Sequence, residues 1–157
     1  THMTLENNVV IRCARAGFHQ HYGRENTIAN NLIAFCGEGG VRRTREETHL
    51  SFTFKRNLVI NEKPQFLHSS FKNGSFAFER NLYFSPNGGS ATWAGKTWEQ
   101  WPASGQDSGS LVADPQLIDP AHPEKGLRPG TPADGIGFVM PDVTRAGPRH
   151  RSPSRTE

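Results

Sequence analysis

Apolar residues recur along this chain in a short phrase that occurs four times at nearly equal intervals. In each copy an Asn is followed by two apolar residues and is preceded, three positions earlier, by another apolar or aromatic residue. The Asn residues lie 23, 26 and 24 positions apart. Such a period is typical of repeat architectures, in which a unit too short to bury a face alone stacks on its neighbours. The copies are Thr4–Val10, Thr27–Ile33, Thr53–Val59 and Ala77–Tyr83.

The residue types within the copies indicate strands. They are rich in Val, Ile, Leu, Phe and Thr and are bounded by Gly, Asn and charged residues. A leucine-rich or helical repeat would need Leu or Ala at helical spacing through the rest of the period, and this is absent. We therefore predict an all-β fold, a right-handed parallel β-helix that forms a short solenoid of about four coils with an irregular C-terminal extension. A β-sandwich with coincidental Asn-apolar dipeptides is the alternative.

Stacked coils predict ladders of like residues along the solenoid axis. We expect the four repeated Asn residues to form one ladder at a turn, because Asn tolerates the left-handed backbone conformation and its amide can bond to the Asn of the next coil. These residues are Asn8, Asn31, Asn57 and Asn81. The apolar residues that directly follow them are expected to stack inside the solenoid; they are Val9, Leu32, Leu58 and Leu82.

The repeat divides the chain into segments. Residues 4–101 are predicted to form the coils, and residues 102–141, where Pro and Gly are frequent, a segment that packs back on them. Residues 142–157 form a basic tail without an apolar pattern, for which flexibility is expected, and residues 1–3 read as an expression remnant. A cluster of Trp residues is predicted to pack at the C-terminal end of the coils, with a sugar-stacking platform as the alternative; these are Trp93, Trp98 and Trp101.

The first copy begins near the start of the chain, with nothing before it that could cap the terminal coil. Solenoid ends normally need caps, so we expect either the C-terminal piece of a longer β-helix or a homo-oligomer that covers the open end. Cys13 and Cys36 are separated by one period and are expected to stack as small buried hydrophobes. A disulfide between them is the alternative.

Charge and hydropathy exclude some classes of partner. The formal net charge is only +3, and the tail carries most of it. The coils show no basic stripe with interleaved aromatic residues, so nucleic acid is not an expected partner. No stretch is long and apolar enough to span a membrane, and no Cys pattern indicates zinc. We expect no cofactor and no metal.

One segment places two His residues side by side. In Gly17–Gly23 the two His alternate with Phe, Gln and Tyr, so in a strand they share a face. Adding the period along the chain predicts two rows on one outer face, His19, Arg42 and His68 in the first and His21, Thr44 and Ser70 in the second. The intervening apolar residues are expected to point inward; they are Phe18, Val41 and Leu67.

The densest charged cluster of the body follows Val41. The segment from Arg43 to His49 also takes up the extra residues of the longest coil in this interpretation. It could be a solvated bulge with weak Arg–Glu pairing. Alternatively it brings two carboxylates, Glu46 and Glu47, close to the His pair, although adjacent residues in an extended segment point to opposite faces.

Several phrases resemble a known family. Gly17–Asn26, Asn30–Phe35, Arg43–Glu47 and Ser51–Asn57, together with the Asp-Pro and Leu-Arg-Pro-Gly-Thr-Pro elements of 114–132, resemble the C-terminal coils of right-handed β-helix glycoside hydrolases of family 141. That family acts on fucosides and xylan. The resemblance covers roughly residues 4–140. Members have further coils upstream, including an acidic strand segment that this chain lacks.

The resemblance implies a carbohydrate-active protein, glycoside hydrolase-like and in truncated form, with an oligo- or polysaccharide of the fucoside or xylan type as partner. Glu46 or Glu47 would be the catalytic acid or base, although hydrolysis ordinarily needs a pair of carboxylates across the scissile bond. Substrate would be held by the basic side chains of the face, namely His19, His21, Arg42, Arg45, His49 and His68. A non-catalytic β-helix that binds glycan or self-associates is the alternative. The resemblance alone favours a secreted or periplasmic location.

Overall fold

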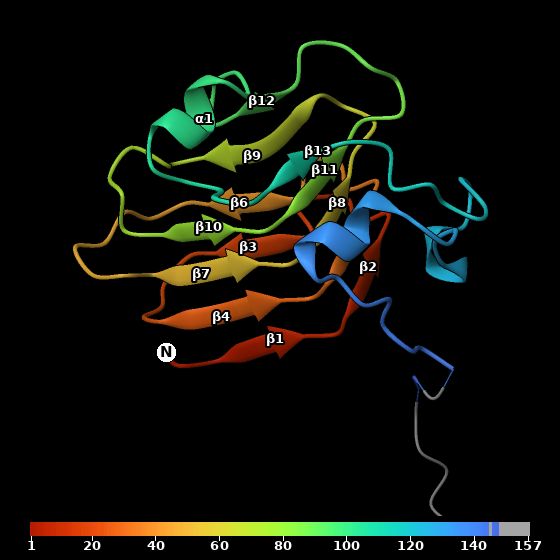
Figure 1. Cartoon of the computed structure of the whole chain (residues 1–157). Coiled ribbons are helices and arrows are strands. Elements are labelled where there is room, and N and C mark those ends of the chain that lie inside the picture. The colour runs from red at the N-terminus through yellow and green to blue at the C-terminus, as the bar shows by residue number, and fades with distance from the viewer. Residues whose placement is uncertain (145, 148–157) are drawn as a thin grey trace, which may run out of the picture.

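The computed structural model describes residues 1–144 and 146–147, so most of the tail assigned to 142–157 lies outside the described residues. Three parallel sheets wind into a β-solenoid of about four turns, as predicted (Figure 1). Sheet A contains β1 (Thr4–Glu6), β4 (Asn26–Ala29), β7 (Phe52–Lys55) and β10 (Ala77–Glu79). Sheet B contains β2 (Val9–Ile11), β5 (Leu32–Ala34), β8 (Leu58–Ile60), β11 (Leu82–Phe84) and β13 (Leu111–Val112). Sheet C contains β3 (Phe18–Gln20), β6 (Val41–Arg43), β9 (Gln65–Ser69) and β12 (Thr92–Trp93).

The helical elements are short. Helix α1 spans Gln100–Ala103, and two 3₁₀ turns, η1 (Pro123–Lys125) and η2 (Pro132–Ile136), belong to the C-terminal segment. In Figure 1, α1 lies beside β12 at one end of the solenoid, and η2 lies against sheet B. None of the helices among the described residues is long and apolar enough to cross a bilayer.

The strand register locates the extra residues of the long coil. β6 pairs with β3 so that Val41 lies opposite Phe18, and this offset equals the shorter period of the Asn phrase. β7 pairs with β4 so that Phe52 lies opposite Asn26, and this offset equals the longer period. The additional residues therefore lie between β6 and β7, which confirms their predicted place in the charged segment.

The Asn ladder is present and continuous. From Asn31 onward, each carboxamide oxygen accepts two hydrogen bonds from the Asn one coil earlier, one from its backbone N–H and one from its side-chain amide. Asn57 Oδ1 lies 2.9 Å from both Asn31 N and Asn31 Nδ2, and Asn81 Oδ1 lies 3.0 Å from Asn57 N and 3.2 Å from Asn57 Nδ2. At the last coil Asp107 Oδ1 accepts from Asn81 Nδ2 at 2.9 Å. The buried amides are thereby satisfied from rung to rung.

The conformational reason that we gave for this ladder is wrong. The ladder Asn residues do not adopt positive φ; the residue before each of them does. The angles are 58° at Asn7, 51° at Asn30, 51° at Arg56 and 50° at Arg80. The left-handed residue turns the chain from sheet A into sheet B, and the Asn that follows directs its amide along the solenoid axis.

The expected orientation of the residues after each Asn is also wrong. Leu32, Leu58 and Leu82 do form a ladder in register, but they pack in a cluster outside the coils, under the C-terminal segment. That segment contributes Leu117, Ala133, Ile136 and Phe138 to the cluster. The next residue of each strand faces the interior instead, namely Val10, Ile33, Val59 and Tyr83. Side chains alternate along a strand, so an inward Asn forces the following residue outward.

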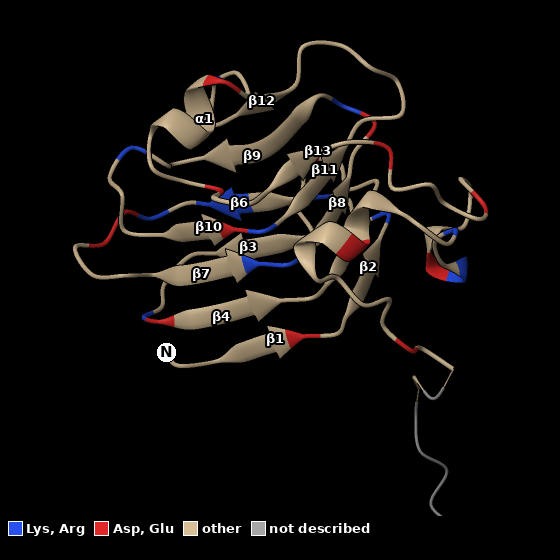
Figure 2. Ribbon diagram, viewed as in Figure 1, with Lys and Arg blue, Asp and Glu red and all other residues tan. Residues whose placement is uncertain are grey.

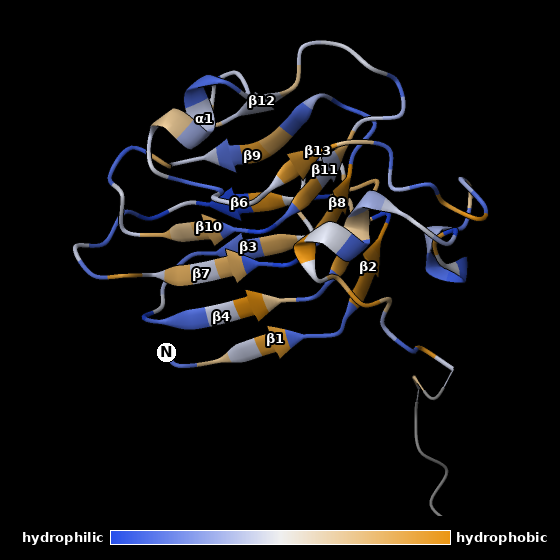
Figure 3. Cartoon of the chain, in the orientation of Figure 1, coloured by the Kyte–Doolittle hydropathy of each residue, from blue (hydrophilic) through white to orange (hydrophobic). Residues whose placement is uncertain are grey.

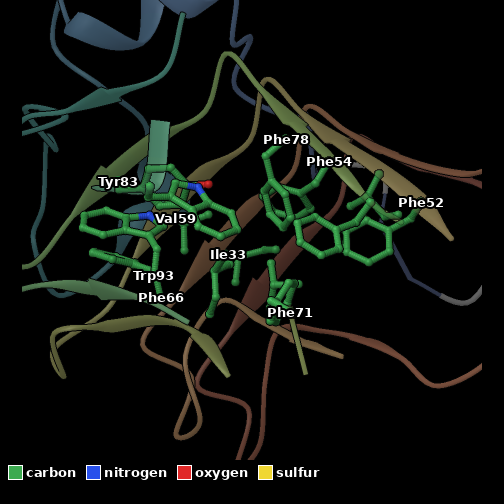
Figure 4. Packing of buried hydrophobic residues seen from close by; sticks show 14 of the residues in the cluster. Ile33, Phe52, Phe54, Val59, Phe66, Phe71, Phe78, Tyr83 and Trp93 are labelled. Atoms are coloured by element: carbon green, nitrogen blue, oxygen red, sulfur yellow. The ribbon is translucent and has the colours of Figure 1, made fainter. Parts of the chain in front are cut away.

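Both faces of sheet B are therefore apolar, and β2 and β8 are coloured as hydrophobic along most of their length in Figure 3. The interior is dominated by aromatic rings, several of which stack in Figure 4. Trp93 and Trp101 are 0% and 1% exposed and Trp98 packs against the same core, which confirms the packing interpretation of the Trp cluster. Asp107 accepts hydrogen bonds there from Trp101 Nε1 at 2.5 Å and from Tyr83 Oη at 2.9 Å.

The first coil leaves three strand edges without a neighbour among the described residues, because β1, β2 and β3 each end their sheet. A cavity of about 420 Å³ opens at this end, lined in part by Leu5, Val10 and Phe18. Cys13 and Cys36 are free thiols that pack with the inner core. Burial raises the pKa of the Cys36 thiol to about 11, which keeps it protonated at neutral pH.

Candidate functional site

The outer face of sheet C carries the first predicted row in register. His19 pairs with Arg42, and Arg42 pairs with His68, so the three side chains lie one strand apart, at steps of about 4.8 Å. On the opposite face of the same strands, Val41 and Leu67 are fully buried in the core with Phe18 packed against it, as predicted. Figure 2 shows β6 as the basic strand in the middle of this sheet.

Thr44 holds the two His rings of the first coil together. Its Oγ1 lies 2.9 Å from His19 Nε2 and 2.8 Å from His21 Nδ1. A threonine hydroxyl has a single hydrogen, so it donates to one ring and the other ring must donate its N–H to it. Desolvation, followed by the charges of Arg42 and His21, lowers the pKa of His19. His19 is therefore mainly neutral at neutral pH, and such a ring can both donate and accept.

Glu38 is a carboxylate of this face that sequence reasoning missed. Its Oε2 lies 2.6 Å from Arg42 Nη1 and its Oε1 lies 3.7 Å from Arg15 Nη1. Partial desolvation opposes ionisation, but the hydrogen bond and charge of Arg42 and the charge of Arg15 outweigh it, so the pKa of Glu38 is lowered. The repeat could have predicted the pairing of Glu38 with Arg15, because these residues are separated by one period, as are Cys13 and Cys36.

Loop Thr44–Ser51 forms one rim of the face. Arg45 lies over the ring of Tyr22 at 4.5 Å from the centroid and donates from Nη1 to Tyr22 Oη at 2.8 Å. Glu46 Oε1 accepts from Ser70 Oγ at 2.5 Å, and this hydrogen bond is the main reason why the pKa of Glu46 is lowered. Glu46 is thus an exposed, ionised carboxylate at the end of the second predicted row.

Glu47 and His49 lie on the other side of the loop. Glu47 Oε2 is 3.4 Å from His49 Nε2 and accepts from Ser51 Oγ at 3.4 Å. His49 Nε2 also lies 3.1 Å from the carbonyl oxygen of Gly23. Both residues line a hollow of about 490 Å³ that is completed by the turn around Asn73. The two carboxylates therefore do not converge on one point.

The buried side chain of Arg43 anchors this loop from the core side, and we did not predict this role. The side chain is fully buried and donates to neutral acceptors, at 3.1 Å to Ser70 O, 2.8 Å to Asn73 Oδ1 and 2.6 Å to Ser75 Oγ. Its guanidinium also lies over the Phe76 ring at 5.3 Å. The Asn73 amide donates to the backbone oxygen of Glu47 at 2.8 Å, which links the buried guanidinium to the rim.

The structure thus brings His19, His21, Arg42, His68 and Glu38 onto one face, with Arg45 and Glu46 at its rim. It places Glu47 and His49 beside a separate hollow. His68 Nδ1 is buried without a hydrogen-bond partner among the described residues. Within the same part of the chain, no group of three or more His, Cys, Asp or Glu is arranged to hold a metal ion.

Comparisons with known proteins assign no family to this chain, because no family model, curated protein or solved structure matches it. The resemblance to glycoside hydrolase family 141 stays a prediction from the sequence phrases.

Proposed function

We propose that this chain is a carbohydrate-active protein that binds an oligo- or polysaccharide across the outer face of sheet C. The observation that carries the proposal is the in-register row of His19, Arg42 and His68 beside the Thr44-bridged His pair. The sequence resemblance supplies the substrate class, a glycan of the fucoside or xylan type.

The chemistry of the face suits sugar hydroxyls. A hydroxyl both donates and accepts, so its binding site needs groups of both kinds. Arg42 offers N–H donors, the ionised Glu38 and Glu46 offer acceptors, and the neutral His19 can act as either. Because the parallel strands place His19, Arg42 and His68 at regular steps along the axis, an extended polymer can contact three successive coils.

Arg42→Ala is expected to weaken glycan binding about tenfold, since hydrogen bonds to charged groups contribute about 1.5–3 kcal/mol each. Isothermal titration with xylo-oligosaccharides and fucosylated oligosaccharides measures the change. Lys55→Ala is the matched control, because it removes a cation from sheet A and should leave the affinity unchanged. Equal affinities for wild type and Arg42→Ala would contradict the proposal.

Hydrolysis by the same face is a second candidate, favoured by the exposed Glu46 carboxylate one coil from the His pair. A glycosidase needs one carboxyl group that stays protonated as the general acid and a second as base or nucleophile. The lowered pKa of Glu38 and of Glu46 suits both carboxylates to act as base or nucleophile, and not as the protonated general acid. Binding is therefore the function that the geometry supports best.

If the chain does hydrolyse glycans, release of reducing sugar from xylan or of aglycone from aryl fucosides should fall at least a hundredfold in Glu46→Gln. Glu47→Gln tests the other predicted catalytic carboxylate. Glycan binding that depends on Arg42 without any turnover by the wild-type chain would eliminate this candidate and keep the first.

Self-association through the first coil stays a prediction.

A further inference from the structure

A third hollow lies between sheet B and the C-terminal segment and shares no lining residue with the His rows of sheet C. Its volume is about 630 Å³, within the range of small-molecule sites. One wall comes from the coils, with Phe35, Ile60 and Phe84, and the facing wall comes from the segment that follows β13. In Figure 1 this segment runs from β13 past the edge of sheet B towards η1.

The two walls are held in place by contacts among the residues that line the hollow and with Arg12 next to it. Arg12 donates from Nη2 to the backbone oxygen of Ala121 at 2.6 Å, and its guanidinium lies 5.5 Å from the Phe35 ring centroid. The backbone N–H groups of Arg128 and Gln116 are also satisfied, the first by Gln116 O at 2.9 Å and the second by Asp114 Oδ1 at 2.7 Å. The hollow is therefore formed before any ligand enters.

Its lining combines aromatic side chains with charged ones. Phe35 and Phe84 are half-buried, so each keeps part of its ring exposed. The lining also holds side chains of both charges, namely the Glu62 carboxylate on the coil wall, and the Asp114 carboxylate and the Arg128 guanidinium on the segment after β13. Among the described residues, the carboxylate of Glu62 and the guanidinium of Arg128 have no hydrogen-bond partner within the chain. They are free to bind a ligand.

We infer that this hollow, lined by Phe35, Phe84, Glu62, Asp114 and Arg128, is a binding site for a neutral mono- or disaccharide. A pyranose has an apolar C–H face that packs on aromatic rings and hydroxyl edges that bond to carboxylates and guanidinium. Two carboxylates oppose an anionic ligand, and the guanidinium opposes a cationic one. The charged groups of the lining do not suit a purely apolar ligand, because they would lose their hydration without compensation.

This inference does not rest on the proposed function of sheet C, since the two sites share no residue. The test is ¹H–¹⁵N chemical-shift titration of the full chain with methyl β-D-xyloside, xylobiose and methyl α-L-fucoside. We expect at least one of these sugars to bind with a dissociation constant of about 1 mM and to shift the amide signals of the non-proline residues within 114–121. Arg42→Ala should leave these shifts unchanged, which separates the two sites.

Ala121→Trp should fill the hollow and weaken binding at least tenfold, and Ala103→Trp, at the exposed end of α1, is its matched control. Glu62→Gln keeps the size of the side chain and should weaken binding about fivefold, so it tests the site even if the Trp variant folds poorly. Unchanged affinity in both variants would overturn the inference. So would a hollow that binds tetramethylammonium or sulfate and none of the three sugars.

Discussion

Asn57→Ala is expected to lower the free energy of unfolding by about 4 kcal/mol. The side chain is fully buried and forms four hydrogen bonds: it accepts from Asn31 N and Nδ2 and donates to Ile28 O and Asn81 Oδ1. A buried group that loses its partner costs about 1–3 kcal/mol, and this substitution strands groups on both neighbouring coils. Urea unfolding followed by circular dichroism measures the change.

Asn8→Ala is the matched control for this prediction. Asn8 belongs to the same ladder but lies at the exposed first coil, where its amide donates to Asn31 Oδ1 at 2.9 Å and to Glu6 O at 3.1 Å. Its loss should lower the free energy of unfolding by about 1 kcal/mol or less, because water can replace the missing bonds. Similar values for the two variants would show that the ladder does not couple the coils.

Arg43→Met should lower the free energy of unfolding by about 3 kcal/mol and also weaken glycan binding. Methionine fills much of the space, but Ser70 O, Asn73 Oδ1 and Ser75 Oγ lose a charged donor. The turn around Asn73 then holds loop Thr44–Ser51 less firmly, so Thr44 and Glu46 are less well positioned. Thermal unfolding and oligosaccharide titration measure the two effects.

Arg45→Met removes the same functional group from an exposed position of the loop and should change the free energy of unfolding by no more than about 1 kcal/mol. Arg43→Lys keeps the charge but not the forked geometry, so it should recover only part of the stability. A buried Arg43→Met variant as stable as Arg45→Met would contradict the assigned role of the guanidinium.

The period of the Asn phrase was sufficient to predict the solenoid, the ladder and the place of the extra residues. It was not sufficient to decide which apolar residues face inward. Leu58 and Val59 are both apolar and both fully buried. Hydropathy therefore does not distinguish the side chain that faces the interior from the one that faces the C-terminal segment. The contrast is lost because the C-terminal segment covers the outer face of sheet B, and this distant contact is not visible in a local pattern.

The row of His19, Arg42 and His68 could likewise be predicted from the period, because residues in register on stacked strands lie together whatever their type. Arg43 was harder to assign, since a charged residue in a polar segment is ordinarily exposed. Its burial depends on Asn73 and Ser75, which lie a whole coil later in the chain. Such partners become apparent only when the loops, and not only the strands, are placed.

Chemical-shift mapping of a bound oligosaccharide on the ¹⁵N-labelled chain is the most direct test of the proposed function. The account predicts that xylo- or fucosyl-oligosaccharides of four or more units shift the amide signals of β3, β6 and β9 and of loop Thr44–Ser51, and that Arg42→Ala abolishes most of these shifts. Shifts confined to sheet A or to the C-terminal segment, or none with any oligosaccharide of either type, would contradict it.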